Sequence, residues 1–140
     1  MKIFLDTNIV IDFLTGRQPF VEDAIKIFQL SQRQGYSLLV SDLSLINVAY
    51  ICRKNFTKQQ IYSALAKLTK FVTVVSIGSQ SVKKAINIQA EDFEDAAQCF
   101  CAVRCKADCI VTRDTEGFRG ISYIKVMGPK ELLHSLDAKL

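Results

Sequence analysis

Acidic residues stand at three widely separated places in this chain, two of them after apolar segments and one at the start of a predicted helix, and carboxylates are ligands that hard metal ions prefer. Asp6 comes directly after apolar residues 3–5, residues 91–95 contain four acids, and Asp114 comes shortly after apolar residues 110–111. If the chain brings these acids together, their charges repel one another unless a cation lies among them. A set of oxygen ligands alone favours Mg²⁺ or Mn²⁺, which can activate water to hydrolyse a phosphodiester bond.

Each of these acids also has a structural explanation when it is taken alone. Asp6 could cap a short helix by accepting hydrogen bonds from the amides of Asn8 or Ile9. Asp92 and Asp95 suit the first turn of a helix, where the helix dipole favours negative charge. Capping does not require three acidic segments to meet at one edge of a sheet, so we favour the metal site.

Short β-branched, apolar runs alternate along the chain with longer segments of helical period, which is typical of repeated βα units. We expect strands over residues 2–5, 37–40, 71–76, 109–112 and 122–126. We expect helices over residues 20–34, 43–53, 57–69, 79–90, 93–106 and 129–136. The predicted fold is a three-layer α/β/α sandwich with a parallel sheet of about five strands, formed as a single domain over residues 1–140. In such sheets ligands bind beyond the carboxyl ends of the strands, which is where the acids fall.

The composition is that of an ordinary globular protein. The 140 residues are 49% hydrophobic and 23% charged, which excludes a disordered or collagen-like chain. Eighteen basic and 14 acidic residues give a net charge of +4, which suits a polyanionic substrate without demanding one. The amino terminus reaches Asp6 too early for a signal peptide, and no apolar run is long enough to cross a membrane. We therefore expect a cytoplasmic protein.

Four of the five cysteines are crowded into one part of the chain, at Cys99, Cys101, Cys105 and Cys109. No pair of them has the CxxC spacing of a zinc site, and the single histidine, His134, is distant in sequence. An odd number of cysteines also argues against a disulfide framework. We expect these side chains to be small, buried apolar groups.

Three sequence motifs, taken in order, resemble those of PIN-domain nucleases. They are Ile3-Phe4-Leu5-Asp6-Thr7-Asn8-Ile9-Val10-Ile11-Asp12-Phe13-Leu14, then Asp95-Ala96 at the start of a helix, and then Ile110-Val111-Thr112-Arg113-Asp114. The resemblance extends over nearly the whole chain, as far as residue 133. It implies a PIN-like fold and an endoribonuclease that depends on Mg²⁺ or Mn²⁺, often the toxin of a bacterial toxin and antitoxin pair of the VapC kind.

Carried over residue by residue, the resemblance makes Asp6, Asp95 and Asp114 the catalytic metal ligands, with Asn8 and Thr112 as polar supports of the site. It also implies RNA as the substrate and a small antitoxin protein as a partner. We further expect a homo-oligomer, taken as a dimer, and no association with a membrane.

Two positions depart from the family pattern. Where many members carry a glutamate on the helix after the second strand, this chain has Asn47, which can hydrogen-bond but adds no negative charge. Asn47 could support the site or make a structural hydrogen bond on an otherwise apolar helix face. Where an acid often precedes the aromatic Phe118, this chain has Gly117, and Glu116 is the candidate extra acid. Asp42 could also supply charge, although a role in a turn or cap suits it better.

Arg113 and Arg17 are the candidate contacts to RNA phosphates, because both fall near the predicted site, whereas the other basic residues are scattered over a solvated surface. The main alternative to an enzyme is a PIN-like module that binds RNA or protein, with a site weakened by Asn47. Two phosphoryl-transfer classes fit less well. A dehalogenase-like domain requires a second aspartate where Asn8 stands, and a receiver domain requires an acid after the third strand.

Overall fold

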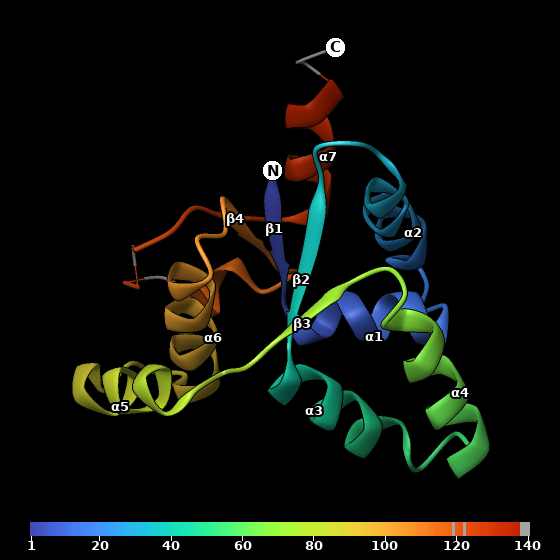
Figure 1. Cartoon of the computed structure of the whole chain (residues 1–140), viewed down its shortest axis with the longest axis horizontal. Helices are drawn as coiled ribbons and strands as arrows, with labels where there is room; N and C mark the ends of the chain where they lie inside the picture. Colours follow the sequence, from blue (N-terminus) through green and yellow to red (C-terminus); the bar gives the residue numbers. More distant parts are fainter. Residues whose placement is uncertain (119, 122, 138–140) are drawn as a thin grey trace.

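The computed structural model describes residues 1–118, 120–121 and 123–137, and a five-stranded parallel sheet forms its centre (Figure 1). The strands lie in the order β3-β2-β1-β4-β5, with β1 in the middle. Their bounds are Lys2–Leu5 (β1), Ser37–Ser41 (β2), Thr73–Val75 (β3), Cys109–Val111 (β4) and Val126–Met127 (β5). Because the side chains of a strand alternate in direction, both faces of this sheet are lined by apolar groups.

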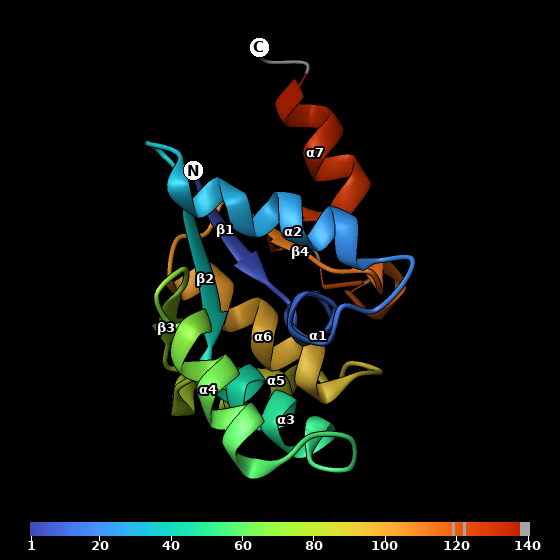
Figure 2. The same cartoon turned by 90° about the vertical axis from the view of Figure 1, so that its right-hand side faces the viewer.

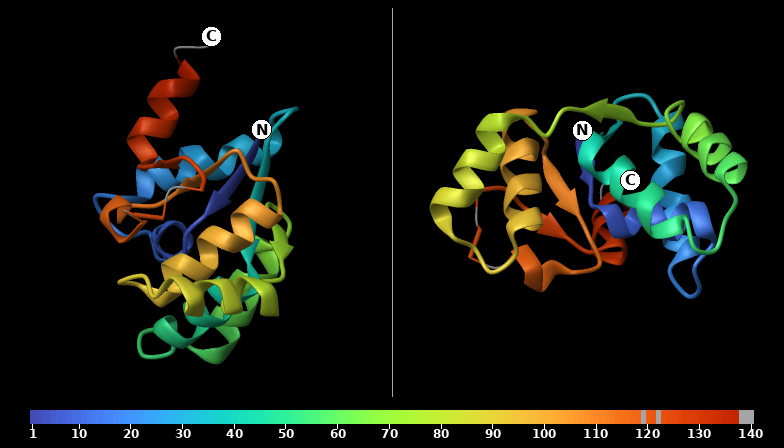
Figure 3. Two further views of the ribbon diagram at one scale, coloured as in Figure 1. Left: turned by 90° about the vertical axis from the view of Figure 1, so that its left-hand side faces the viewer. Right: turned by 90° about the horizontal axis from the view of Figure 1, so that it is seen from below.

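Helices cover both faces of the sheet and complete three layers. Their bounds are Thr7–Thr15 (α1), Val21–Gln29 (α2), Asp42–Cys52 (α3), Lys58–Leu68 (α4), Ser79–Ile88 (α5), Phe93–Arg104 (α6) and Pro129–Asp137 (α7), with short 3-10 helices at Leu30–Gln32 (η1) and Thr115–Phe118 (η2). Figure 2 faces the side of the molecule formed by α1 to α4, and the left-hand view of Figure 3 faces the side formed by α5 and α6. The predicted three-layer α/β/α sandwich with five parallel strands is confirmed.

Each face of the sheet has its own hydrophobic core. Ile3 and Leu5 of β1 point into the larger core, which is shared with α1 to α4 and α7, whereas Phe4 between them points into the core of α5 and α6. All three side chains are completely buried. Burial of an apolar side chain of this size stabilises the fold by about 1.5–3 kcal/mol, which explains why β1 is anchored at the centre of the sheet.

Helix α1 is not predicted by the sequence pattern, although residues 7–15 form a regular helix. Its middle is rich in β-branched residues, whose helix propensity is low. Two end signals offset this weakness. Asp6 caps the amino terminus by accepting a hydrogen bond from the backbone amide of Thr7, and Gly16 ends the helix in the left-handed conformation with φ of 65°. The position of α1 therefore follows from its caps and its packing against the sheet.

Several other predicted elements have different limits in the structure, among them the strand expected over residues 71–76, which is limited to Thr73–Val75. The helix expected over residues 20–34 is α2, which gives way at Leu30 to the 3-10 turn η1. The strand expected over residues 122–126 is wrong in position, since pairing with β4 occurs only at Val126 and Met127. Residue 122 lies outside the described residues. The pairing is short because β5 is an edge strand that meets only the three residues of β4.

The carboxyl ends of β1 and β4 form the edge of the sheet that concerns function, and we call it the carboxyl edge. The chain order reverses between these two neighbouring strands, and such a reversal opens a crevice in parallel sheets. The backbone amide of Asp6 donates to the carbonyl of Val111 at 3.0 Å, which fixes the two strand ends together. The right-hand view of Figure 3 looks at this edge, where α1, α3 and α6 surround it.

None of the five cysteines, all of which lie in the described part of the chain, forms a disulfide bond. Cys99 and Cys101 are completely buried in the core beside α6, and burial raises the pKa of the Cys99 thiol to about 11. This is the buried apolar role expected from the sequence. Within the described residues, the helices are too short or too polar for a bilayer crossing.

Candidate active site

Asp6 occupies the centre of the carboxyl edge, where it is 6% exposed. One carboxylate oxygen accepts from the backbone amide of Thr7 at 2.8 Å, and the other accepts from the hydroxyl of Thr112 at 2.8 Å. Burial is the largest effect on this carboxyl group and raises its pKa. The two hydrogen bonds lower the pKa, and the negative charges of Glu94 and Asp114 raise it further. Asp6 is thus both the cap of α1 and an acid of the site.

Asn8 and Thr112, the predicted supports, lie directly beside Asp6 and connect it to the segment after β4. The side-chain amide of Asn8 donates to the hydroxyl of Thr112 at 3.1 Å and, more weakly, to Asp6 at 3.4 Å. The hydroxyl of Thr112 also accepts from the backbone amide of Asp114 at 3.0 Å. The side-chain Oδ1 of Asn8 accepts from the backbone amide of Arg113 at 3.2 Å. These contacts hold the segment carrying Asp114 next to Asp6.

Asp95 lies in the first turn of α6 and is 8% exposed. The capping role belongs to Asp92, whose side chain accepts from the backbone amide of Asp95 at 2.9 Å. Burial and the charges of Asp6, Asp92, Asp114 and Glu94 all raise the pKa of the Asp95 carboxyl, to about 7. No lowering effect offsets them among the residues that the structure describes. Asp95 is therefore a buried acid in an acidic setting without a compensating cation.

Asp114 is exposed and faces Asp95 across a small gap that exists because residue 117 is glycine. A β-carbon placed on Gly117 would lie 2.2 Å from a carboxylate oxygen of Asp95 and 2.8 Å from a carboxylate oxygen of Asp114. The backbone amide of Gly117 donates to the other oxygen of Asp114 at 3.2 Å. The departure from the family pattern at this position has a physical reason here, since the two carboxylates fill the space of a side chain.

Glu94 is a further acid near the site, and its sequence position does not distinguish it from the other acids of residues 91–95. It is exposed on α6 beside Asp95, and its charge raises the pKa of both Asp6 and Asp95. The side-chain amide of Asn47, on α3, donates to Glu94 Oε1 at 2.9 Å. The signal in the sequence is the run of acids before Asp95, but only the structure shows which of them has a partner across the crevice.

Asp12 and Arg113 form a second arrangement close to the site. Asp12 is 1% exposed on α1, and its carboxylate accepts from Arg113 Nε at 2.6 Å and from Nη2 at 3.2 Å. The guanidinium also lies over the ring of Phe20, 3.9 Å from its centre, and Arg17 lies 6.0 Å from the same ring. The two arginines predicted to contact RNA phosphates thus gather around one aromatic side chain. Because Arg113 precedes Asp114, its ion pair also fixes the backbone of the site.

Behind the acids lies a buried polar network. The hydroxyls of Thr7 and Ser44 are 2.8 Å apart, and the side-chain amide of Gln98 donates to the hydroxyl of Ser44 at 2.8 Å. Gln98 is completely buried, and its Oε1 has no hydrogen-bond partner among the described residues. The network links the segments that follow β1 and β2 to α6, which carries Asp95 three residues before Gln98.

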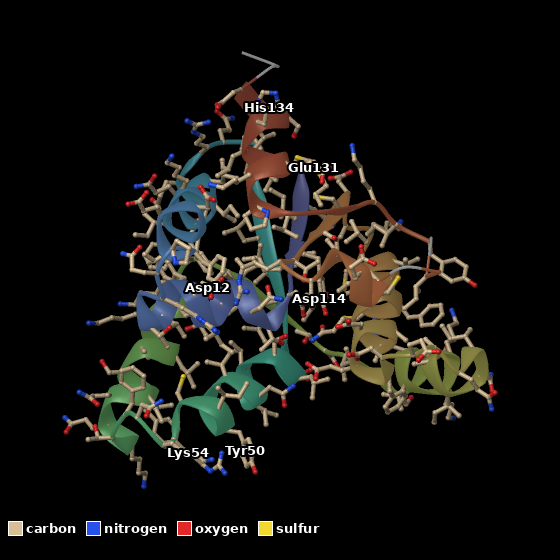
Figure 4. The ribbon with its side chains drawn as sticks, turned by 180° about the vertical axis from the view of Figure 1, so that it is seen from behind. Asp12, Tyr50, Lys54, Asp114, Glu131 and His134 are labelled. Atoms are coloured by element: carbon tan, nitrogen blue, oxygen red, sulfur yellow. The ribbon has the colours of Figure 1, made fainter. Side chains whose placement is uncertain are left out.

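The remaining candidates lie at different distances from the acids. Asp42 accepts from the backbone amides of Leu43 and Ile77 at 2.8 and 2.9 Å, which is the structural role that suited it. Glu116 is exposed on η2, and its role as an extra acid stays a prediction. His134 lies on α7 at the top of Figure 4, away from Asp114, which lies near the centre of the molecule.

The donor set suits a hard divalent cation, because the carboxylates of Asp6, Asp95 and Asp114 come from separate segments, and the charges of Asp6 and Asp114 raise the pKa of Asp95. The gap over Gly117 brings oxygens of Asp95 and Asp114 within 3 Å of one point. Within residues 1–118, 120–121 and 123–137, no three His, Cys, Asp or Glu side chains stand close enough together to hold an ion as they are placed. A bound ion therefore requires these side chains to move closer together.

The fold and the site together define the class of this protein. It is a parallel α/β sandwich with buried acidic residues where the order of the strands reverses. The sequence model of the PIN domain matches residues 2–116, and the chain belongs to the PIN-domain family. No curated protein matches the sequence.

Crystal structures with the same fold come from bacterial toxin and antitoxin systems. A chain of VapBC2 from Rickettsia felis, solved bound to a DNA fragment from the promoter, is 16% identical with a TM-score of 0.71, over 91% of this chain and 98% of that one. A chain of VapBC-1 from nontypeable Haemophilus influenzae is 21% identical with a TM-score of 0.72, over 93% and 99%. VapC20 of Mycobacterium tuberculosis, a toxin that cleaves the sarcin-ricin loop, is 15% identical with a TM-score of 0.63, over 77% and 86%.

Proposed function

We propose that this protein is a metal-dependent endoribonuclease with Asp6, Asp95 and Asp114 as its catalytic residues. The observation that carries the proposal is the meeting of three acids from sequence-distant segments, two of them buried, at the carboxyl edge. Membership of the PIN-domain family supports a nuclease. The RNA-cleaving activity of VapC20, which shares the fold, supports RNA as the substrate.

The three acids would hold Mg²⁺ or Mn²⁺, and such an ion supplies a hydroxide nucleophile and stabilises negative charge on the phosphate. The residues of the chain prepare this site. Thr7, Thr112 and Asn8 orient the carboxylate of Asp6 by hydrogen bonds. The carboxyl of Asp95, with a pKa of about 7, can hold a proton at neutral pH and release it when a cation approaches.

The positive charges near the site belong to Arg17 and Arg113, next to Phe20. They are proposed to contact RNA phosphates and bring the backbone of the substrate to the acids. Arg113 uses two of its nitrogens on Asp12, so its remaining donor face is the part that can contact a phosphate.

Cleavage of single-stranded RNA by the purified protein tests this function. We expect cleavage with Mn²⁺ or Mg²⁺ and none in excess EDTA, with Asp95→Asn as the inactive control. Undiminished cleavage in EDTA would contradict the dependence on metal. The only histidine, His134, lies away from Asp114 and is not placed to act as a general base instead (Figure 4). Absence of cleavage with every ion would favour the PIN-like binding module.

We also propose an antitoxin protein as the partner, supported by the VapBC proteins among the structural neighbours. Expression of the chain should arrest bacterial growth, and coexpression of the small protein encoded beside it should restore growth. Asp95→Asn should remove the toxicity while leaving the complex intact. Growth that is unaffected by active enzyme would contradict the toxin role. Light scattering of the purified chain tests the predicted dimer.

A further inference from the structure

The hydrogen bond between Asn47 and Glu94 joins two helices on opposite sides of the crevice. Asn47 lies in the middle of α3, and Glu94 is the second residue of α6. The amide of Asn47 donates to Glu94 Oε1 at 2.9 Å. Asn47 thus stands where family members commonly have a glutamate, and its side chain holds a glutamate that comes from the other helix.

Glu94 also belongs electrostatically to the site. Its charge acts on Asp6, which follows β1, and on Asp95, which is its neighbour on α6. The exposed carboxylate of Glu94 therefore lies near enough to two buried acids for its charge to act on both.

The helix dipole alone does not explain this arrangement. An acid in the first turn of a helix is favoured, but α6 already has Asp92 as its cap. Placing a further acid where it repels Asp6 and Asp95 is unfavourable for the protein without a cation. The side-chain amide of Asn47 on α3 nevertheless holds Glu94 in that position. A bound cation would explain the arrangement, because it would attract the carboxylate of Glu94 together with those of Asp6 and Asp95.

We propose that Glu94 supplies the fourth carboxylate of the metal site and that Asn47 is the residue that positions it. The proposal rests on the metal-dependent function proposed above. It means that the charge lost from α3 at Asn47 is replaced from α6, so that the site keeps four acids: Asp6, Glu94, Asp95 and Asp114.

Mn²⁺ binding to the metal-free protein, measured by calorimetry, tests the proposal without any need for cleavage. Glu94→Gln removes the charge while its side-chain carbonyl can still accept from Asn47. We expect Mn²⁺ affinity to fall about tenfold, because ligand charge governs the binding of hard cations. Glu91→Gln is the matched control, since Glu91 is also exposed, lies just before α6 and is not among the charges that raise the pKa of Asp6 or Asp95. It should bind Mn²⁺ within about twofold of wild type.

The melting temperature of the metal-free protein gives a second readout. If Glu94 repels the acids, Glu94→Gln should raise the melting temperature. If Glu94 only complements the helix dipole, the same change should lower it and leave Mn²⁺ affinity unaltered, which would overturn the proposal.

A relocated carboxylate tests the role of Asn47. Asn47→Ala keeps the charge of Glu94 but loses its positioning contact, and Mn²⁺ affinity should fall about threefold. The double variant Asn47→Glu with Glu94→Gln places the carboxylate on α3 and the amide on α6, and it should recover most of the affinity lost in Glu94→Gln. An unrecovered affinity in a double variant that melts like wild type would mean that α3 does not face the ion.

Failure of this inference is distinguishable from failure of the proposed function. If wild-type protein neither binds Mn²⁺ nor cleaves RNA, the metal-dependent function is wrong. If wild-type protein does both and Glu94→Gln behaves like Glu91→Gln, the function stands and the assignment of Glu94 is wrong.

Discussion

The two halves of the candidate site are built differently. The strand half, formed by Asp6, Asn8 and Thr112 after β1 and β4, is held by hydrogen bonds within the protein. In the helix half, formed by Glu94 and Asp95 on α6, the charge of Glu94 raises the pKa of Asp95 and also that of Asp6. Asp6 and Asp95 are about equally buried, at 6% and 8% exposure, so burial alone does not distinguish them. In the strand half, hydrogen bonds from Thr112 and Thr7 offset part of the effect of burial on Asp6, whereas every effect given for Asp95 in the helix half raises its pKa.

Removal of one acid from each half should give the largest effect and separate activity from stability. Asp95→Asn and Asp6→Ala should each reduce RNA cleavage by ~10²- to 10⁴-fold, as expected for a lost catalytic group. Their effects on the metal-free protein should have opposite signs. Asp95→Asn removes a repelled charge and should keep or raise the free energy of unfolding. Asp6→Ala removes the cap of α1 and leaves Thr112 without its acceptor, which should cost ~1–3 kcal/mol.

Urea unfolding in EDTA measures these stabilities, and an RNA cleavage assay in Mn²⁺ measures the activities. A large loss of stability in Asp95→Asn with activity retained would show that Asp95 is a structural residue of α6. Equal losses of stability in both variants would remove the distinction between the two halves.

The pH dependence of stability should also reveal the helix half. The pKa of Asp95 is raised from 3.8 to about 7 in the folded protein, so the native state binds a proton that the unfolded chain has released. Protonation of Asp95 therefore stabilises the folded protein relative to the unfolded chain. This contribution to the free energy of unfolding is fully present below about pH 4, and it is lost as the pH rises towards 7. At ~1.4 kcal/mol per pKa unit, the shift corresponds to at most ~4 kcal/mol.

Chemical denaturation of metal-free protein at pH 5 and pH 8 checks this sign. The wild type should be less stable at pH 8, and Asp95→Asn should reduce that difference. Saturating Mn²⁺ should reverse the trend, because a bound cation favours the ionised acid. A wild type that gains stability from pH 5 to pH 8 in EDTA, with no change in the Asn variant, would contradict the raised pKa.

The ion pair of Arg113 with Asp12 lies beside the strand half, and variants of it test whether Arg113 stabilises the fold there. Arg113→Gln leaves the carboxylate of Asp12 buried without its partner and should lower the free energy of unfolding by ~3 kcal/mol. Arg113→Gln combined with Asp12→Asn should recover part of that loss. If Arg113 served only RNA phosphates, the single variant would keep its stability and lose RNA affinity, with a weaker dependence on salt. Arg17→Gln is the matched comparison, since Arg17 is exposed and no ion pair involves it in the described part of the chain.

Much of the strand half could be predicted from the sequence, and the reason is local. Asp6 and Thr112 directly follow a short apolar strand, and Asn8 and Asp114 come two residues later, so the order of strands in a parallel sheet is enough to bring them to one edge. Helix α1 could not be predicted in the same way. Its β-branched residues have a low helix propensity, and the helix depends on the caps at its two ends.

The helix half could be predicted only in part, because it depends on contacts between distant elements. Four acids stand in residues 91–95, and nothing in their order shows that Asp92 is the cap while Glu94 meets Asn47 on α3. The importance of Gly117 is similarly hidden, since it follows from the positions of two carboxylates on other segments. Such roles are set by packing, which a single sequence does not reveal.

The smallest predicted effect concerns Gly117, which lies where the two halves meet. Gly117→Ala would place a β-carbon 2.2 Å from an oxygen of Asp95 and 2.8 Å from an oxygen of Asp114, so both carboxylates must move. Because misplacing catalytic groups by about 1 Å costs up to ~10²-fold, we expect a loss of cleavage of ~10-fold or more with little change in stability. Gly128→Ala is the control, since its β-carbon would meet only the carbonyl of Thr112 at 4.0 Å.

Cleavage rates and Mn²⁺ affinities of the two alanine variants show whether the space over Gly117, between the carboxylates of Asp95 and Asp114, matters for metal binding and cleavage. If Gly117→Ala lowers Mn²⁺ affinity together with cleavage, the carboxylates of Asp95 and Asp114 act on the same ion, and the helix half and the segment after β4 share it. If cleavage and affinity match those of Gly128→Ala, the carboxylates move aside at no cost to function. In that case Asp95 and Asp114 do not act on one ion through this gap, and the ion must be held mainly by Asp6 with the acids of α6.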